Sequence, residues 1–371
     1  MNKKILISIN TSWNIINFRL GLLQSLQKEG FKIIVLAPKD KYSELFDSYD
    51  FEYHDIEMNN KGTNPIEDIK LTISYYKLLK EIKPDLMLNY TIKPNVYGTI
   101  AANLLNIPTI NNIAGLGTLF VNENFITKIA KYLYKYSQDK ASKVFFQNNE
   151  DFDLFTSSKL VDAKKSDILP GSGVNTDKFK PIEKTKNLEK IVFLLISRML
   201  WDKGVGEYVE AARILTKKYP NVEFQLLGFL DVINNSAILK EQMDMWIEEG
   251  VINYLGTSDN VQNEISNSDC IVLPSFYREG TPRTLLESAS MAKPIVTTNN
   301  IGCKDVVNDG ETGYLCKIKD SVDLGSKLEL IINMSEEDRI IMGQKGRKKI
   351  IEEYDEQIVI NKYLKAIKEI L

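Results

Sequence analysis

A buried strand, an amphipathic helix and a second buried strand open this chain, and the same order returns near its middle. Residues 4–9 form a β-branched apolar run, a leucine-rich helical pattern follows, and residues 32–36 form the next run. Residues 191–196, 204–218 and 222–227 repeat this order. Such strand–helix–strand units require parallel strands covered by helices. The sequence therefore predicts an α/β protein with two βαβ-type halves.

The two halves are expected to meet near residue 180. Segment 171–181 consists largely of turn-forming residues, and a charged stretch continues to Lys190. The length of 371 residues also favours two domains, because single cores stop growing at about 250–300 residues. We expect domains over 1–180 and 181–354. Further strands are predicted at 86–89, 109–113, 144–146, 251–255, 270–273, 294–297 and 313–315.

The composition excludes several kinds of site and function. The chain has one histidine, His54, which excludes a zinc site built from several histidines. No Asp or Ser beside it suggests a triad, so we interpret His54 as structural or exposed. A net charge of −3 gives no general attraction to nucleic acid. Three cysteines without C-x-x-C spacing fit a reducing cytosol.

The apolar segments of the sequence are short. None approaches the ~20 residues of a membrane-spanning helix, and the N-terminal run is too short for a signal peptide. Residues 124–143 instead predict a basic amphipathic helix, in which five lysines alternate with aromatic and aliphatic side chains. Such a helix can lie on an anionic membrane surface, or it can be the solvated cover of a domain core. Both interpretations stay open.

The most informative segment is LPSFYREGTPRTLLE, residues 273–287. A strand ends at its start, a loop follows, and Thr281 and Pro282 are residue types of a helix N-cap and first position. Free amides and the dipole at that helix end favour an anion. Glu279 in the loop and Glu287 in the helix can accept hydrogen bonds from sugar hydroxyls. The segment therefore predicts a site for a phosphorylated sugar.

A second polar loop follows the strand 191–196. It carries Arg198 and Lys203, whose guanidinium fork and compact ammonium suit a diphosphate. In a doubly wound sheet, this loop and the loop of Glu279 both leave the carboxyl ends of strands, where ligands bind.

Together these motifs resemble glycosyltransferase family 4. The resemblance is carried by Arg198 with Lys203-Gly204, by Glu279-Gly-Thr-Pro with Glu287 at the Glu-x7-Glu spacing, and by the turn at 308–313. In the first half, residues 91–95 and Gly115-Leu116-Gly117 are similar to the bacterial branch that builds surface polysaccharides or lipid-linked oligosaccharides. The resemblance covers essentially the whole chain.

The resemblance implies a GT-B fold, with two Rossmann-like doubly wound domains facing each other across a cleft. Residues 1–180 would bind the acceptor and 181–354 the nucleotide-sugar donor, with the helix 355–371 packing back on the first domain. It also implies that the sugar is transferred with retention of its anomeric configuration and that no metal or further cofactor is required.

The resemblance also assigns roles to individual residues. Glu279, Arg198 and Lys203 are the expected catalytic residues: Glu279 would hold the donor sugar, and the two cations its diphosphate. Glu287 would bind the ribose. The other expected donor contacts are Thr281, Pro282, Arg283 and Thr284 from the second domain, and Asn14 and Gly115 from the first.

Two places depart from the family's pattern. Ala114 stands where many members carry a histidine, and residues 11–14, Thr-Ser-Trp-Asn, replace the usual glycines of the phosphate turn. The chemistry must therefore depend on carboxylates, fixed positive charge and the phosphate of the donor.

Three other interpretations of the motifs are disfavoured. Asp151-Phe152-Asp153 imitates a metal-binding Asp-x-Asp, but it opens a helix, where acids complement the dipole. Gly115-Leu116-Gly117 lacks the third glycine of a dinucleotide fingerprint. A hydrolytic pair of Glu279 and Glu287 is less favoured than binding roles.

The sequence thus predicts a cytoplasmic enzyme, peripheral on the inner face of the membrane. It would transfer a hexose or N-acetylhexosamine from a nucleotide donor, with UDP preferred, to a polyprenyl-diphosphate-linked glycan in polysaccharide, O-antigen or capsule biosynthesis. A nucleotide-sugar epimerase of the same fold and a non-catalytic nucleotide-sugar-binding protein are the alternatives.

Overall fold

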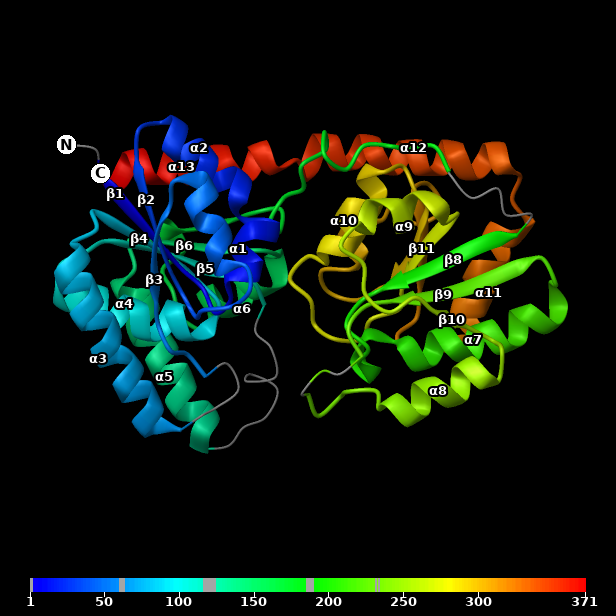
Figure 1. The fold of residues 1–371 in the computed structure, drawn as a ribbon, viewed down its shortest axis with the longest axis horizontal. Coiled ribbons are helices and arrows are strands. Elements are labelled where there is room, and N and C mark those ends of the chain that lie inside the picture. Colours follow the sequence, from blue (N-terminus) through cyan, green and yellow to red (C-terminus); the bar gives the residue numbers. More distant parts are fainter. Residues whose placement is uncertain (1–2, 60–63, 116–124, 185–189, 231, 233) are drawn as a thin grey trace. The chain divides into compact units, whose positions relative to one another are not determined.

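The computed structural model describes residues 3–59, 64–115, 125–184, 190–230, 232 and 234–371. The chain forms two compact units, one of Met1–Gly173 with Glu356–Leu371 and one of Val174–Asp355 (Figure 1). The division falls after Gly173 rather than near 180, because Val174 and Phe179 are buried in the core of the second unit.

The first unit is built on a seven-stranded parallel sheet in the order β3-β2-β1-β4-β5-β6-β7. Its strands are β1 (Lys4–Ser8), β2 (Lys32–Ala37), β3 (Glu52–Asp55), β4 (Leu86–Tyr90), β5 (Thr109–Ile113), β6 (Lys143–Phe146) and β7 (Ser166–Ile168). Its α-helices are α1 (Ser12–Phe18), α2 (Leu20–Lys28), α3 (Pro65–Ile82), α4 (Thr99–Leu104), α5 (Phe125–Lys140), α6 (Asn149–Ser157) and α13 (Glu356–Ile370). The strand order reverses between β1 and β4, which defines the switch point of this sheet.

Helices cover both faces of this sheet, so its strands are apolar on both sides (Figure 1). In β1, Ile5 and Ile7 belong to one core cluster, whereas Leu6 belongs to the cluster on the other face. The C-terminal helix α13 packs against α2, and Ile360 and Tyr363 are buried in the same cluster as Ile5. The last residues of the chain are therefore part of the first unit.

The second unit repeats this architecture with a six-stranded parallel sheet in the order β10-β9-β8-β11-β12-β13. Its strands are β8 (Ile191–Ile196), β9 (Val222–Leu227), β10 (Asn253–Tyr254), β11 (Cys270–Leu273), β12 (Ile295–Thr298) and β13 (Gly313–Cys316). Its α-helices are α7 (Val205–Lys218), α8 (Lys240–Glu248), α9 (Val261–Asn267), α10 (Arg283–Ser290), α11 (Ser321–Asn333) and α12 (Glu336–Glu353). The order reverses between β8 and β11. The predicted α/β class with two doubly wound sheets is confirmed.

Two helix starts differ from the sequence-based expectation. The residues after β1 form a helix from Ser12, because the side chain of Thr11 accepts a hydrogen bond from the Asn14 amide and caps it. This helix thus begins within residues 11–14, the segment that stands in place of the usual glycine turn. The later helix α10 begins at Arg283 with Pro282 as its N-cap, one residue later than expected, because ψ of Pro282 is extended at 117°.

The described part of the chain contains no helix that is both long and apolar enough to cross a membrane.

Candidate active site

Two loops leave neighbouring strands at the switch point of the second unit. Strands β8 and β11 run side by side, with Leu194 paired to Ile271. The loop after β8 carries Arg198 and Lys203, and the loop after β11 carries Glu279. The carboxyl ends of strands beside a switch point form the ligand crevice of doubly wound sheets. The two predicted loops thus meet where a ligand is expected.

Backbone hydrogen bonds fasten the two loops together. The carbonyl oxygen of Asp202 accepts bonds from the amides of Phe276 and Tyr277, each at 3.0 Å. The next glycine, Gly204, has φ 76°, and a Cβ there would lie 2.1 Å from the carbonyl oxygen of Pro274. Glycine is therefore required at 204 both for its backbone angle and for this close approach.

Lys203 and Glu279 form an ion pair between the loops. The Lys203 Nζ contacts Glu279 Oε1, and the Ser275 hydroxyl donates a 3.0 Å hydrogen bond to the same oxygen. Their side chains are only 13% and 14% exposed. The Nζ also lies 5.2 Å from the centre of the Tyr277 ring. The structure brings these two predicted residues together, but as partners of each other.

Residues at and just after the end of strand β12 hold the Glu279 loop through hydrogen bonds to its backbone. Thr298 Oγ1 donates to the carbonyl oxygen of Ser275 at 2.5 Å, and Asn300 Nδ2 donates to that of Tyr277 at 2.8 Å. Gly302 has φ 79°, and a Cβ there would lie 2.1 Å from the carbonyl oxygen of Gly280. No local motif marks these supporting residues, so sequence reasoning missed them.

Arg198 is the exposed cation of the site. Its side chain makes no hydrogen bond or ion pair with any residue that the structure describes. Burial raises the pKa of the neighbouring Asp202 carboxyl; Glu279 adds to this effect, whereas Lys203 and Arg198 oppose it. Burial also raises the pKa of Tyr277. Arg198 is therefore available to bind an anion.

The first turn of α10 brings several expected contacts to the site. Thr281, Arg283 and Thr284 are half-buried and Pro282 is buried around this helix start. The first-turn amides of a helix and its dipole favour a negatively charged group.

Glu287 is buried one turn further along α10. It is 8% exposed, and its Oε1 accepts a 2.8 Å hydrogen bond from Nε of Arg283. Burial raises the pKa of Glu287, while the charge and hydrogen bond of Arg283 oppose this shift. Arg283, which was expected as a donor contact, thus orients the carboxylate through its side chain.

The two predicted residues of the first unit lie at the carboxyl edge of its sheet. Asn14 is in the first turn of α1, directly after β1. Gly115 follows β5 with φ 131°, whereas Leu116 and Gly117 of the same motif lie outside the described residues.

The disfavoured motifs have ordinary structural surroundings. His54 Nε2 lies 2.7 Å from Glu52 Oε1 on β3. Asp151 is buried in the first turn of α6, where its amide donates to the side chain of Asn148. In the described ranges, no three His, Cys, Asp or Glu side chains gather as a metal site. The cysteines are free and buried, and burial raises the pKa of Cys303 to about 12.

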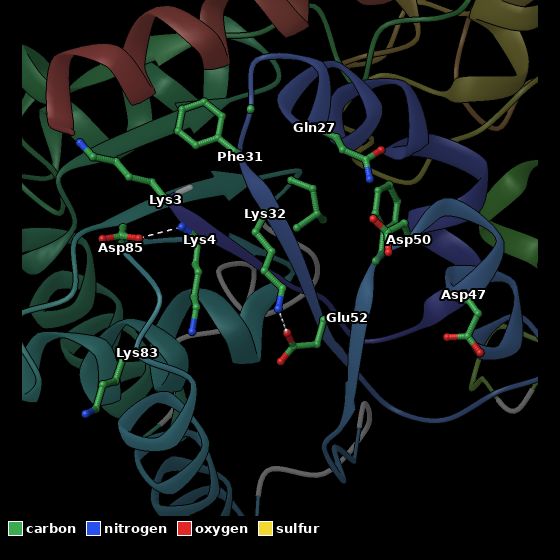
Figure 2. Close-up of a pocket in the computed structure, with 13 residues that line it drawn as sticks. Lys3, Lys4, Gln27, Phe31, Lys32, Asp47, Asp50, Glu52, Lys83 and Asp85 are labelled. Carbon is green, nitrogen blue, oxygen red and sulfur yellow. Dashed lines mark hydrogen bonds and ion pairs between the residues drawn. The ribbon is translucent and has the colours of Figure 1, made fainter. Parts of the chain in front are cut away.

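A cavity of about 990 Å³ lies at the amino ends of the strands of the first unit (Figure 2). Figure 2 marks two interactions among its lining residues. Lys32 Nζ lies 2.5 Å from Glu52 Oε2, and the backbone amide of Lys4 donates to Asp85 at 2.7 Å. This edge is opposite to the ligand edge of a doubly wound sheet. The cavity therefore lies away from the expected site.

Comparisons with known proteins agree with the two-unit organisation. A model described as "Glycosyl transferase 4-like" matches residues 4–148, and "Glycosyl transferases group 1" matches 176–349. The N,N'-diacetylbacillosaminyl-diphospho-undecaprenol alpha-1,3-N-acetylgalactosaminyltransferase of Campylobacter jejuni is 28% identical over 96% of both chains. The UDP-Gal:alpha-D-GlcNAc-diphosphoundecaprenol alpha-1,3-galactosyltransferase of Escherichia coli is 27% identical, over 77% of this chain and 76% of its own.

Solved structures share the fold. A glycosyltransferase from Rickettsia africae superposes with a TM-score of 0.81 at 20% identity, covering 100% of this chain and 98% of its own. Anabaena HepE, solved in complex with UDP, gives 0.78 at 15% identity over the whole of both chains.

The two Rossmann-like sheets, with paired loops at the switch point of the second, define a glycosyltransferase of the GT-B fold. More particularly, the chain belongs to glycosyltransferase family 4, in the branch of its bacterial relatives named above. The family resemblance and the GT-B fold predicted from the sequence are confirmed.

Proposed function

We propose that this glycosyltransferase moves a hexose or N-acetylhexosamine from a UDP-sugar to a glycan on a polyprenyl diphosphate, with retention at the anomeric carbon. The product would serve polysaccharide, O-antigen or capsule synthesis. The names of the Campylobacter and Escherichia relatives, both with diphospho-undecaprenol acceptors, support the acceptor class. The observation that carries the proposal is the Lys203–Glu279 pair beside the exposed Arg198, which has no ion-pair partner among the described residues.

Donor binding would exchange the partners of this ion pair. The diphosphate takes the place of the Glu279 carboxylate at Lys203 and also engages Arg198. The hydroxyls of the donor sugar take the place of Lys203 at Glu279. Each buried charge then keeps a partner, so the exchange avoids the cost of an unpaired charge. Glu287, held by Arg283, would accept hydrogen bonds from the ribose hydroxyls.

The reaction itself would use the donor as its own base. A hydroxyl of the acceptor attacks the anomeric carbon on the face that the diphosphate leaves. The bond from that carbon to the phosphate oxygen breaks, and a diphosphate oxygen takes the hydroxyl proton. Arg198, Lys203 and the first turn of α10 stabilise the negative charge that develops on the leaving group. These fixed charges would make a divalent cation or a further cofactor unnecessary, so turnover should persist in EDTA.

The role of Glu279 can be tested by separating turnover from donor binding. Glu279→Gln should lower turnover about 10²–10³-fold, the effect typical of one lost transition-state contact, while the Kd of UDP stays near that of the wild type. Arg198→Gln should instead weaken UDP binding. Transfer is followed with a short-chain lipid-linked acceptor, and NMR of the product reports its anomeric configuration. Wild-type turnover in Glu279→Gln, or an inverted product, would contradict the assigned mechanism.

The two alternative functions have direct tests of their own. An epimerase would convert the donor sugar without any acceptor, and a binding protein would leave donor and acceptor unchanged. Incubation of UDP-sugars with and without the lipid-linked acceptor, analysed by chromatography, distinguishes all three functions.

We also propose that α5 contacts an anionic membrane surface. Ile129, Tyr132 and Tyr136 are 46%, 69% and 39% exposed and lie on one stripe of this helix, with Lys135 and Lys140 also exposed. Its other side carries Tyr134, which is buried at 3% exposure, so the exposed stripe is not needed to cover the core.

A second exposed apolar stripe supports the same membrane contact. On α3, Ile66, Ile69 and Ile73 are 65%, 60% and 49% exposed. Both α3 and α5 pack on the segment Pro94–Gly98. Apolar side chains beside lysines are typical of helices that lie in a lipid interface.

Liposome flotation tests this surface. Tyr132→Ser with Lys135→Glu should reduce binding to vesicles that contain anionic lipid, whereas Val322→Ser, an equally exposed apolar position of the second unit at 68%, should not. Unchanged flotation of the α5 variant would dismiss the membrane contact.

A further inference from the structure

Arg19 of the first unit is a buried cation without a counter-ion. It lies at the break between α1 and α2 and is 6% exposed. It makes no ion pair and no side-chain hydrogen bond with any described residue, and its Nε is fully buried. Its guanidinium lies over the ring of Tyr90, whose centre is 4.5 Å from the guanidinium carbon.

Physical chemistry makes this arrangement costly in the ligand-free protein. A guanidinium does not lose its proton in proteins, so it cannot escape the cost of burial by becoming neutral. One cation–π contact returns only a small part of that cost. A group buried in this way is best explained by an anion that completes its surroundings.

Some neighbouring buried polar groups do have partners. Asn111 donates to Gln138 at 2.9 Å, and Asn112 donates to the hydroxyl of Tyr363 at 3.1 Å. Other buried atoms of this region, such as Asn89 Oδ1 and Thr109 Oγ1, have no hydrogen-bond partner among the described residues. Arg19 differs from these neutral groups because it carries a fixed positive charge.

The position of Arg19 is that of a ligand group. Helix α1 directly follows β1, and Tyr90 is the last residue of β4, so Arg19 lies at the switch point of the first sheet. Thr91, the next residue after β4, has φ 66° and a buried Oγ1 without a hydrogen-bond partner in the described part of the chain. Asn14 Oδ1 is a further buried and unpartnered atom of this edge.

We propose that Arg19, with the hydroxyl of Thr91, binds a phosphate group of a diphosphate on the first unit. The planar fork of arginine can donate two parallel hydrogen bonds to one phosphate. Two sources have this chemistry: the lipid diphosphate of the acceptor and the diphosphate of the nucleotide donor. Only the choice between these two sources rests on the proposed function; the binding of a phosphate group by Arg19 does not.

Binding measurements with three probes test the site and separate the sources. Inorganic pyrophosphate, UDP and farnesyl diphosphate are titrated into the wild type and into Arg19→Gln. A tenfold or greater loss with farnesyl diphosphate and unchanged UDP affinity identifies the acceptor as the source. A similar loss with UDP identifies the donor. Unchanged affinities for all three probes overturn the proposal.

Thermal stability gives a second and independent readout. Without ligand, Arg19→Met should melt a few degrees above the wild type, because it removes an uncompensated buried charge. Arg213→Met is the matched control. It should not gain stability, because the substitution removes the ion pairs that Arg213 forms with Glu210 and Glu249. A clear drop in the melting temperature of Arg19→Met would mean that Arg19 is structural, which contradicts the site.

These readouts do not require turnover. If Arg19 binds diphosphate but the protein transfers no sugar, the proposed function fails and the site stands. If transfer is confirmed and Arg19→Gln changes no affinity, the site fails and the function stands.

Discussion

At the scale of single residues, the buried charges of this glycosyltransferase are of two kinds, paired and unpaired. In the second unit, Lys203 is paired with Glu279, and Arg283 with Glu287. In the first unit, Arg19 is buried and has no such partner among the described residues. A buried pair contributes little net stability, but the loss of one member leaves an uncompensated charge. Removal of one charge from a pair should therefore lower the stability of the protein, whereas removal of the charge of Arg19 should raise it.

The first prediction concerns the Lys203–Glu279 pair. Lys203→Met should lower the free energy of unfolding by about 1–3 kcal/mol, because Glu279 keeps its charge without its partner. The double variant Lys203→Met/Glu279→Gln should recover most of this stability while remaining inactive. Urea denaturation of the wild type, both single variants and the double variant measures the coupling. Strictly additive effects would show that the two side chains do not interact in solution.

A second prediction follows from the raised pKa of Glu287. The buried carboxyl prefers its proton in the folded state, whereas the unfolded chain releases it near the ordinary value of 4.5. The contribution of Glu287 to the stability of the folded protein is therefore complete below pH 4.5. It is lost as the pH rises through the pKa that Glu287 has in the folded state. The stability of the wild type relative to Glu287→Gln should fall over that range. Denaturant unfolding of both proteins from pH 4 to pH 8 tests this prediction. If the stability of the wild type relative to Glu287→Gln instead rises with pH, the charge of Arg283 outweighs the effect of burial on Glu287.

At the scale of elements, the site depends on how closely two loops approach. The loop after β8 and the loop after β11 are joined through the backbone of Asp202, so their separation does not depend on flexible side chains. Gly204 sits at this junction. The second unit also offers Gly250, which has almost the same φ of 74° but nothing within 4 Å of an added Cβ.

Comparison of these two glycines isolates the close approach. Gly250→Ala should cost about 1–2 kcal/mol, the strain of a left-handed residue with a side chain. Gly204→Ala has the same strain and in addition overlaps Pro274, so it should cost about 1–3 kcal/mol more. It should also abolish UDP binding, which Gly250→Ala should retain. Chemical denaturation and UDP titration measure both effects; equal behaviour of the two variants would show that the loops can separate freely.

At the scale of the whole molecule, the two units differ in how the chain builds them. Val174–Asp355 is continuous in sequence, whereas the first unit needs Glu356–Leu371 to complete its core. In α13, Val359, Ile360 and Tyr363 are each at most 3% exposed. Burial of side chains of this size contributes about 1.5–3 kcal/mol each, so the last helix is a major part of the first unit.

Truncation after Asp355 should therefore affect one unit only. We expect the first unit to lose cooperative unfolding and to expose its core, while the second unit still unfolds cooperatively and binds UDP. Differential scanning calorimetry and hydrogen exchange resolve the two units. Intact protection of β1 and β4 in the truncated chain would refute this division of the core.

Much of the fold was predictable because periodicity reports burial locally. Strand β5 and strands β8, β9 and β11 lie at the predicted bounds, since runs of apolar residues specify strands buried on both faces. The positions of the two site loops followed from the same pattern, because parallel strands end at one edge. Helix starts were less certain, as Thr11 and Pro282 show, because capping depends on backbone angles that residue types only bias.

The sequence alone therefore determined the two parallel sheets, the family, and the loops that carry Arg198, Lys203 and Glu279. Only the tertiary structure decided that Lys203 pairs with Glu279, that Asp202 holds the two loops together, and that Arg19 is buried with no counter-ion among the described residues. The physical reason is the distance along the sequence over which each kind of interaction acts. Burial patterns repeat within a few residues, whereas these contacts join residues about seventy positions apart, which only the packed sheets bring together.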